Sequence, residues 1–375
     1  MYRKMRFSDC DLGDPFFDSL KEDYLEFPTW FGKKAEDGAE AYVSIDDGRI
    51  QAFVYVKEEH GEAVGDLPAE DRLKIGTLKI CSDFKGQRLG EGGIGLALWE
   101  WQRSPYQQIY LTVYPKHDDL IGLIESFGFY NAGNKGEELV YVKDKGRLDS
   151  EDTERAGFRS FPYIDPEFRR GVYLPIKAKY HDNMFPYSTL RNTSQSTDPM
   201  PVANGISKAY IATPNHTISY RPGDIALVYR MAETDRTYKS AITSYCTVST
   251  VEWFKTNGRL AEGKSWDGFV KAAGNKTVYD EAELKAAFEK KFVCIITLVY
   301  NGYFGEGHNV NNAWLRSQGL FEGHPYDIKL TREEVYSILR EGGIDEKFAA
   351  FDKPRTRDQH NEREQEVRIQ EDQMP

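Results

Sequence analysis

A glycine-rich turn holds the residues whose types and spacing best suit chemistry. An alternating apolar strand over residues 74–80 is followed by the turn at 85–95 and then by an apolar helix. The first backbone N–H groups of a helix have no partner within the helix, and they lie at the positive end of its dipole. Several such donors can hold one anion, so the turn indicates a cofactor that carries linked phosphates.

Two glycine patterns fit this turn. Gly90, Gly92 and Gly95 satisfy G-x-G-x-x-G, the dinucleotide-binding pattern. That pattern requires its first glycine directly after the strand and an acidic residue about 20 residues later. Here a polar run at 82–88 separates the strand from the glycines, and the next strand, 108–114, ends without a carboxylate. The spacing disfavours a dinucleotide.

The second pattern is Gln/Arg-x-x-Gly-x-Gly/Ala, filled by Gln87, Gly90 and Gly92. It is followed in chain order by a helix over 94–102, a strand over 109–113 and the ending Glu-Ser-Phe-Gly-Phe at 125–129. This order resembles the acyl-coenzyme-A-binding core of GNAT-type N-acetyltransferases. The resemblance implies a mixed sheet with helices on both faces and acetyl-CoA, or another acyl-CoA, as cofactor.

The resemblance also implies which residues hold that cofactor. In the GNAT family the amides of the turn bind the pyrophosphate, and two neighbouring strands diverge so that free backbone groups bind the pantetheine. A Cβ at Gly90 or Gly92 would block close approach of the backbone, which makes glycine necessary there. The implied cofactor-binding residues are Ile80, Cys81, Ser82, Gln87, Arg88, Leu89, Gly90, Glu91 and Gly92.

The catalytic residues depart from the family pattern. The usual general acid is a tyrosine, and Ile124 stands at its position. Either Tyr114, Tyr130 or another residue replaces it, or the thiolate leaves unassisted, or the domain binds acyl-CoA without catalysis. His117 stands where the family often has an asparagine that contacts the cofactor, and an imidazole there could act as a base or a ligand.

A charged segment at 149–164 without apolar periodicity predicts a linker between two domains, 1–148 and 165–348. Within the first domain, Asp47-Gly48 between two apolar strands predicts a hairpin. Within the second, Asp280-x-x-Glu283 and Thr331-x-x-Glu334 predict two capped helices. The tail at 349–375 is dominated by charged residues and glutamine, and a disordered tail is expected.

The second domain resembles a PUA-like β-barrel of the ASCH type. The resemblance rests on Gly-Ile-Ser-Lys at 205–208, on Pro-Gly-Asp-Ile-Ala-Leu-Val-Tyr at 222–229 and on a late apolar strand at 292–300. The family's G-x-K-x-x-E-x-R pattern lacks its Glu and Arg here, which argues against an ASCH-type hydrolase. Cationic and aromatic side chains suited to a base or nucleotide predict a substrate site at Lys208, Tyr210, Tyr229 and Arg230.

Composition limits the remaining classes. The net charge of −11 argues against a broad nucleic-acid-binding surface. The four cysteines match no zinc or redox spacing, so neither a metal nor a disulfide is expected. No apolar run of about 18 residues and no signal-peptide pattern is present, and a cytoplasmic protein is expected.

Together these observations predict an α+β chain in which a GNAT-like domain precedes a small PUA-like barrel. The predicted function is an acyl-CoA-dependent N-acetyltransferase whose barrel selects the acceptor, such as an RNA, a nucleotide or an RNA-associated protein. The alternative is a non-catalytic acyl-CoA sensor with a barrel that binds nucleic acid or a nucleotide.

Overall fold

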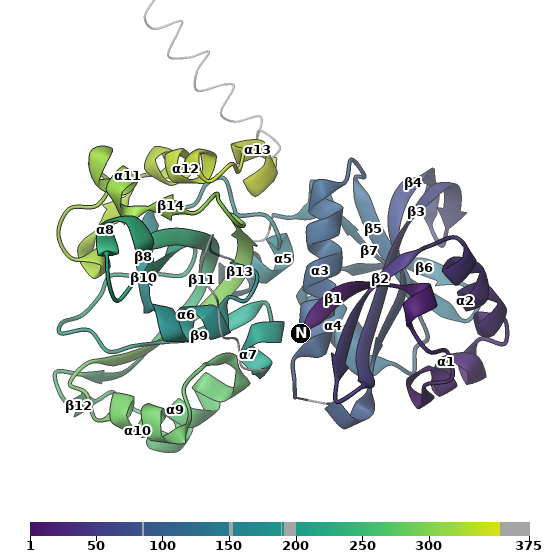
Figure 1. Cartoon of the computed structure of the whole chain (residues 1–375), viewed down its shortest axis with the longest axis horizontal. Helices are drawn as coiled ribbons and strands as arrows, with labels where there is room; N and C mark the ends of the chain where they lie inside the picture. Colours follow the sequence, from purple (N-terminus) through teal and green to yellow (C-terminus); the bar gives the residue numbers. More distant parts are fainter. Residues whose placement is uncertain (85, 150–152, 189, 191–199, 353–375) are drawn as a thin grey trace, which may run out of the picture.

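The computed structural model of the chain describes residues 1–84, 86–149, 153–188, 190 and 200–352, so most of the predicted tail and part of the predicted linker lie outside the described residues. Two sheets lie side by side, and one long helix, α3, stands between them (Figure 1). The first sheet belongs to the N-terminal half of the chain and the second to the C-terminal half.

The first sheet has seven strands in the order β1-β2-β3-β4-β5-β7-β6. The β4–β5 pair is parallel and the other pairs are antiparallel. The predicted hairpin joins β2 to β3, where Asp47 and Gly48 have φ of 47° and 74°, as a type I′ turn requires. The strands are β1 (Tyr2–Arg6), β2 (Glu40–Asp46), β3 (Arg49–Val64), β4 (Leu67–Ile80), β5 (Gln108–Val113), β6 (Tyr130–Lys135) and β7 (Glu138–Asp144).

Helices cover both faces of this sheet (Figure 1). Strand residues alternate between the faces, so Ala52 and Val54 of β3 pack with α3, whereas Phe53 and Tyr55 join an aromatic cluster with α2. On the first face lie α3 (Leu89–Arg103) and α4 (Asp118–Ser126), and on the second lie α1 (Asp18–Asp23) and α2 (Phe27–Glu36).

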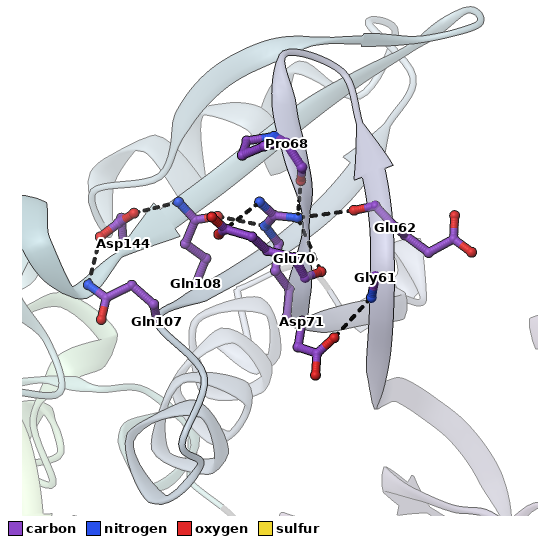
Figure 2. A network of polar contacts seen from close by, with 9 residues as sticks. Gly61, Glu62, Pro68, Glu70, Asp71, Gln107, Gln108 and Asp144 are labelled. Carbon is purple, nitrogen blue, oxygen red and sulfur yellow. Dashed lines mark hydrogen bonds and ion pairs between the residues drawn. The ribbon is translucent and has the colours of Figure 1, made fainter.

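A buried arginine and its hydrogen-bond partners connect neighbouring strands of the first sheet. Arg72 of β4 is 1% exposed, and its Nε donates to Oε1 of Gln108 at 2.6 Å. Its Nη1 donates to the carbonyl oxygen of Pro68 at 2.8 Å, and Gln108 donates in turn to Asp144 of β7 at 2.5 Å. Figure 2 shows this network, which ties the β3–β4 hairpin to the start of β5 and the end of β7.

The second sheet follows an open path, β15-β8-β10-β11-β13-β9, with β12 and β14 beside β11. Among the described residues no pairing joins its outer strands, so the predicted barrel is an open sheet. The β8–β10 pair is parallel and the remaining pairs are antiparallel. The strands are β8 (Gly171–Lys177), β9 (Ser207–Ala212), β10 (Ile225–Met231), β11 (Ala241–Thr256), β12 (Arg259–Leu260), β13 (Val293–Tyr303), β14 (Val310–Asn311) and β15 (Lys329–Leu330).

Helices surround the second sheet. Both predicted capping boxes are confirmed, at α10 with Asp280 and Glu283 and at α12 with Thr331 and Glu334. The helices are α5 (Thr153–Ser160), α6 (Ala178–Met184), α7 (Pro201–Asn204), α8 (Arg236–Lys239), α9 (Trp266–Ala273), α10 (Glu281–Phe288), α11 (Asn312–Ser317), α12 (Arg332–Glu341) and α13 (Glu346–Ala349). The predicted linker thus contains α5, which packs against β11 through Gly157.

The two halves share one hydrophobic core. Buried residues of α3 and the first sheet join those of β10, β11 and β13 in a single cluster. Trp99 of α3 is 2% exposed, and its Nε1 donates to the carbonyl oxygen of Asn301 at 2.7 Å. Gln102 donates to the carbonyl oxygen of Phe348 at 3.0 Å. The helix is therefore buried by the sheet on one side and by the C-terminal half on the other.

Candidate functional site

The parallel strands β4 and β5 pair over a very short distance. Their register joins Leu73 to Ile109 and Lys74 to Tyr110. Beyond these positions β4 continues to Ile80 and β5 to Val113, and no further pairing joins them among the described residues. The Arg72 network lies next to the paired positions, so it fixes the closed end from which the two strands diverge.

Backbone groups of β4 face this divergence at alternate residues. The amide of Cys81 donates to the carbonyl of Gln51 on β3 at 2.8 Å. In an antiparallel pair alternate residues address opposite neighbours, so the groups of Leu78 and Ile80 face the open side. The amide of Cys81, predicted to bind the cofactor, is thus committed to the sheet. The backbone groups of Ile80, which the sequence predicted to bind the cofactor, face the open side, and so do those of Leu78, which the sequence did not predict. Ser82 follows in a short 3₁₀ turn.

The start of α3 offers free donors near the same place. The helix begins at Leu89, preceded by Arg88 in the left-handed region with φ of 57°. The amides of Leu89, Gly90 and Glu91 are the first of the helix, and no acceptor for them occurs among the described residues. These are the donors that the sequence predicted for a pyrophosphate.

Gly90 faces the divergence. A Cβ built on it would lie 3.1 Å from Cδ2 of Leu123 on α4 and 3.9 Å from Cγ1 of Ile80 at the end of β4. This glycine therefore allows α3 to pack closely against α4 beside the end of β4.

The other predicted residues of the turn face the C-terminal half instead. The guanidinium of Arg88 is 5% exposed and donates to Glu91 and to Oγ of Ser207. A Cβ on Gly92 would lie 2.3 Å from the carbonyl oxygen of Asn204, so this glycine is needed for contact between the halves. Gln87 is exposed and presents its carbonyl to Asn204. The side chain of Arg88, predicted to line the approach to the pyrophosphate, is thus engaged with the C-terminal half. The amide of Gly92, predicted to face the pyrophosphate, donates to the carbonyl oxygen of Arg88 at 3.1 Å.

A polar cluster lies at the end of β5 on the sheet face that carries α1 and α2. The hydroxyl of Tyr24 donates to Oε1 of Glu138 at 2.7 Å, and its ring lies 5.6 Å from that of Tyr114. Lys116 forms an ion pair with Asp23 at 2.6 Å. Burial and the bond to Glu138 raise the pKa of Tyr24 well above its ordinary value. The end of α1 thus reaches across β4 to β5 and β7.

Of the three predicted catalytic residues, the structure brings one to this cluster. Tyr114 is half-buried and directly follows β5. His117 is exposed and precedes α4 without capping it through its side chain. Tyr130 starts β6, which β7 separates from β5, and the guanidinium of Arg147 covers its ring at 4.0 Å. Ile124 is fully buried in the core, so α4 supplies no proton donor there.

Sequence reasoning missed Tyr24 and Glu138, which lie 114 residues apart. It also missed two lysines of β4. Lys79 donates to Oγ of Ser19 at 2.6 Å, and Lys74 lies 5.2 Å from the ring centroid of Tyr110. Burial lowers the pKa of each lysine. No local motif marks these residues, because the fold alone brings them to one face.

The four residues predicted to bind a base do not form a common site. Lys208 is fully buried, and its Nζ donates to the carbonyl oxygen of Val202 at 2.5 Å. Arg230 is 7% exposed and donates to Asp182, whereas Tyr229 packs against Phe321 in a different cluster.

Tyr210 is half-buried, and its hydroxyl donates to the carbonyl oxygen of Pro175 at 2.8 Å. The predicted substrate site in the C-terminal half therefore consists of side chains already engaged within the protein.

A buried polar chain continues from Arg230. Asp182 accepts from Nε of Arg230 at 2.8 Å, and it lies 2.8 Å from Nδ1 of His181. Nε2 of His181 lies 2.7 Å from Oγ1 of Thr243. His181 is fully buried, and burial lowers its pKa below the ordinary value. The order of groups is that of a catalytic triad, but both His181 and Thr243 are 0% exposed, so a substrate has no access to them.

The described residues contain no group of three His, Cys, Asp or Glu side chains arranged to hold a metal ion. Within the described part of the chain, no helix combines the length and apolar character needed to cross a membrane.

Comparisons with known proteins find no matching protein-family model and no matching curated protein. Solved structures do resemble part of the chain. The PaiA N-acetyltransferase of Thermoplasma acidophilum, solved with coenzyme A, has 13% identity and a TM-score of 0.30, covering 38% of this chain and 98% of that one. The ribosomal-protein-alanine N-acetyltransferase of Brucella melitensis has 14% identity and a TM-score of 0.29, covering 38% and 99%. The N-acetyltransferase PseH of Campylobacter jejuni, solved with acetyl coenzyme A, has 10% identity and a TM-score of 0.28, covering 38% and 99%.

Proposed function

We propose that this chain is an acyl-CoA-dependent N-acetyltransferase whose active site is the divergence between β4 and β5. The observation that carries the proposal is that diverging strands and the start of a helix lie at the same place. Among the described residues, two parallel strands that pair only at Leu73 and Lys74 open toward the start of a helix whose first amides have no acceptor. A pantetheine arm needs free strand backbone and a pyrophosphate needs helix amides, and both occur at this one place.

The reaction is direct acyl transfer. The acceptor amine attacks the thioester carbonyl, a C–N bond forms and the C–S bond breaks. The coenzyme A thiolate leaves with a proton from the general acid, and the amine releases one proton to solvent, from which the general acid is reprotonated. A backbone N–H of Leu78 or Ile80 stabilises the oxyanion, and such a fixed donor lowers the barrier by about 3 kcal/mol in a dry site. Cys246 and Cys294 are buried with raised thiol pKa values, so neither suits a covalent intermediate.

Tyr114 is the proposed general acid for the thiolate. It directly follows β5, and Tyr24 and Glu138 hold its surroundings in place. Ile124 cannot take this role because it carries no proton donor. The acceptor amine enters on this face, beside the end of α1.

For the C-terminal half we propose a structural role in the enzyme rather than binding of RNA. The cationic side chains expected to contact a base, Lys208 and Arg230, are buried and engaged. The proposed acceptor is therefore an amine without an assigned RNA or nucleotide part.

Binding and turnover test the proposal separately. Calorimetry should show that the full-length chain binds coenzyme A, and a thiol-release assay with a panel of amines should show turnover. Gly90→Asp should abolish binding, because it adds a carboxylate and a Cβ where the phosphates approach. Gly122→Asp is the matched control, since that exposed glycine of α4 has nothing within 4 Å of its built Cβ. Coenzyme A binding that is equal in the two variants would refute the site.

The second candidate is a non-catalytic acyl-CoA sensor. The observation that favours it is the fully buried Ile124 at the usual position of the general acid. The sensor requires coenzyme A binding that depends on Gly90, with no thiol release from any amine. Thiol release that falls in Tyr114→Phe would exclude the sensor.

A further inference from the structure

We propose that Asn204 and Asn275, two residues of the C-terminal half, orient the phosphate-binding turn of the N-terminal half. This inference rests on the proposed function, because it assigns these residues a task in cofactor binding. They act as positioning residues, since they hold the turn and do not touch the phosphates.

Both side chains donate to carbonyls of the turn. Nδ2 of Asn204 donates to the carbonyl oxygen of Gln87 at 3.0 Å, and Nδ2 of Asn275 donates to that of Gly86 at 2.6 Å. A third contact follows on the helix, where the amide of Ser207 donates to Oε1 of Glu91 at 2.5 Å. Three donors from the C-terminal half thus hold consecutive parts of the turn and of the first turn of α3.

The direction of these bonds decides where the amides point. In a trans peptide the C=O and the following N–H point in opposite directions. The carbonyl of Gln87 is drawn toward Asn204, so the N–H of Arg88 is turned away from the C-terminal half. Gly90, two residues on, faces Leu123 and Ile80 at the divergence. The C-terminal half therefore holds the turn by its carbonyl side. The amide of Gln87 donates to the carbonyl oxygen of Phe84 at 3.2 Å, so among the described residues the amides left for an anion begin at Arg88.

Asn204 and Asn275 are themselves held in place by neighbouring elements. Asn204 ends α7, and Lys208 fixes this helix by donating to the carbonyl of Val202. Asn275 lies in a 3₁₀ turn, η5 (Gly274–Lys276), which packs against both α7 and β9. Ordering a turn costs backbone conformational entropy, and fixed donors bear part of this cost before the cofactor arrives.

Two buried polar atoms at the same junction have no hydrogen-bond partner among the described residues. They are Nη1 of Arg88 and Oδ1 of Asn204. Unpaired buried polar atoms are rare in folded proteins and cost free energy. They occur where the C-terminal half meets the start of α3.

The test separates phosphate binding from pantetheine binding. Calorimetry on full-length Asn204→Ala and Asn275→Ala should show about five- to tenfold weaker binding of coenzyme A for each, the loss expected for one hydrogen bond. Binding of pantetheine, which lacks phosphates, should be unchanged. Asn215→Ala is the matched control, because Asn215 is an exposed asparagine of the same half. Circular dichroism melting of each variant verifies that the fold is retained.

The outcomes are distinct. Wild-type protein that binds neither coenzyme A nor pantetheine refutes the proposed function itself. Wild-type protein that binds coenzyme A, with both variants binding it equally well, refutes only the positioning role. Equal losses for coenzyme A and pantetheine in a folded variant also overturn the inference, since the turn would then not be the part affected.

Discussion

Gly92→Ala tests the close contact between α3 and Asn204, through which the helix joins the two halves. A Cβ on Gly92 would lie 2.3 Å from the carbonyl oxygen and 3.2 Å from the carbonyl carbon of Asn204. Real Cβ contacts are essentially never below 3.0 Å, so α7 or α3 must move by at least 3.0 − 2.3 = 0.7 Å. The atoms met are backbone, so no side-chain rotation relieves the clash. Overpacking of this kind costs about 1–3 kcal/mol.

The opposing term is the helix propensity, because alanine is favoured over glycine in a helix by about 1 kcal/mol. The difference of the two terms is a loss of up to about 2 kcal/mol in the free energy of unfolding for Gly92→Ala. Gly122→Ala on α4 meets nothing within 4 Å and should raise it by up to about 1 kcal/mol. Urea titrations followed by circular dichroism measure both. Gly92→Ala that proves as stable as Gly122→Ala would refute the close contact between α3 and Asn204.

Three further predictions concern the site and its supports. Tyr114→Phe should lower kcat about 10²-fold if this hydroxyl protonates the thiolate, whereas Tyr130→Phe should match wild type in the same thiol-release assay. Gln108→Leu leaves Nε of the buried Arg72 unpaired and should lower the free energy of unfolding in urea by about 1–3 kcal/mol, and an effect no larger than that of Gln107→Leu would contradict this. Burial lowers the pKa of Lys143 from 10.5 to about 7, so between these values the unfolded chain binds a proton that the folded chain lacks. The free energy of unfolding should therefore rise with pH across this window by at most ~1.4 kcal/mol per unit, and Lys143→Met should remove that slope in pH-dependent urea titrations.

Local signals predicted the local structure. Asp47-Gly48 predicted the hairpin because its residues tolerate positive φ, and the two capping boxes predicted the starts of α10 and α12 because their bonds span three residues. A helix after the glycine-rich turn was predicted for the same reason, but over 94–102, whereas α3 already begins at Leu89, so most glycines of the predicted turn lie in its first turns. Each of these features depends on a few neighbouring residues.

Features that depend on distant contacts were not predictable in the same way. The alternating strands of the C-terminal half indicated a sheet, but closure depends on strand pairings that no single segment encodes, and the sheet is open. Gly92 seemed to serve a phosphate, yet its partner is Asn204, more than one hundred residues along the chain. The charged segment before β8 was predicted to be a linker, but it contains α5, whose Gly157 packs against Thr247 of β11.

The position of α3 explains why the two halves act as one unit. One side of the helix packs on the first sheet, and the side that carries Gly92, Gly95 and Trp99 packs on the C-terminal half. The first turn of the same helix carries the free amides of the proposed cofactor site. Any shift of the C-terminal half against α3 therefore displaces the donors that a pyrophosphate needs. Because the hydrophobic core is continuous through the helix, such a shift must disturb buried contacts in both halves at once. The C-terminal half is for this reason part of the rigid frame of the proposed cofactor site, although its own side chains lie behind the turn rather than in the divergence.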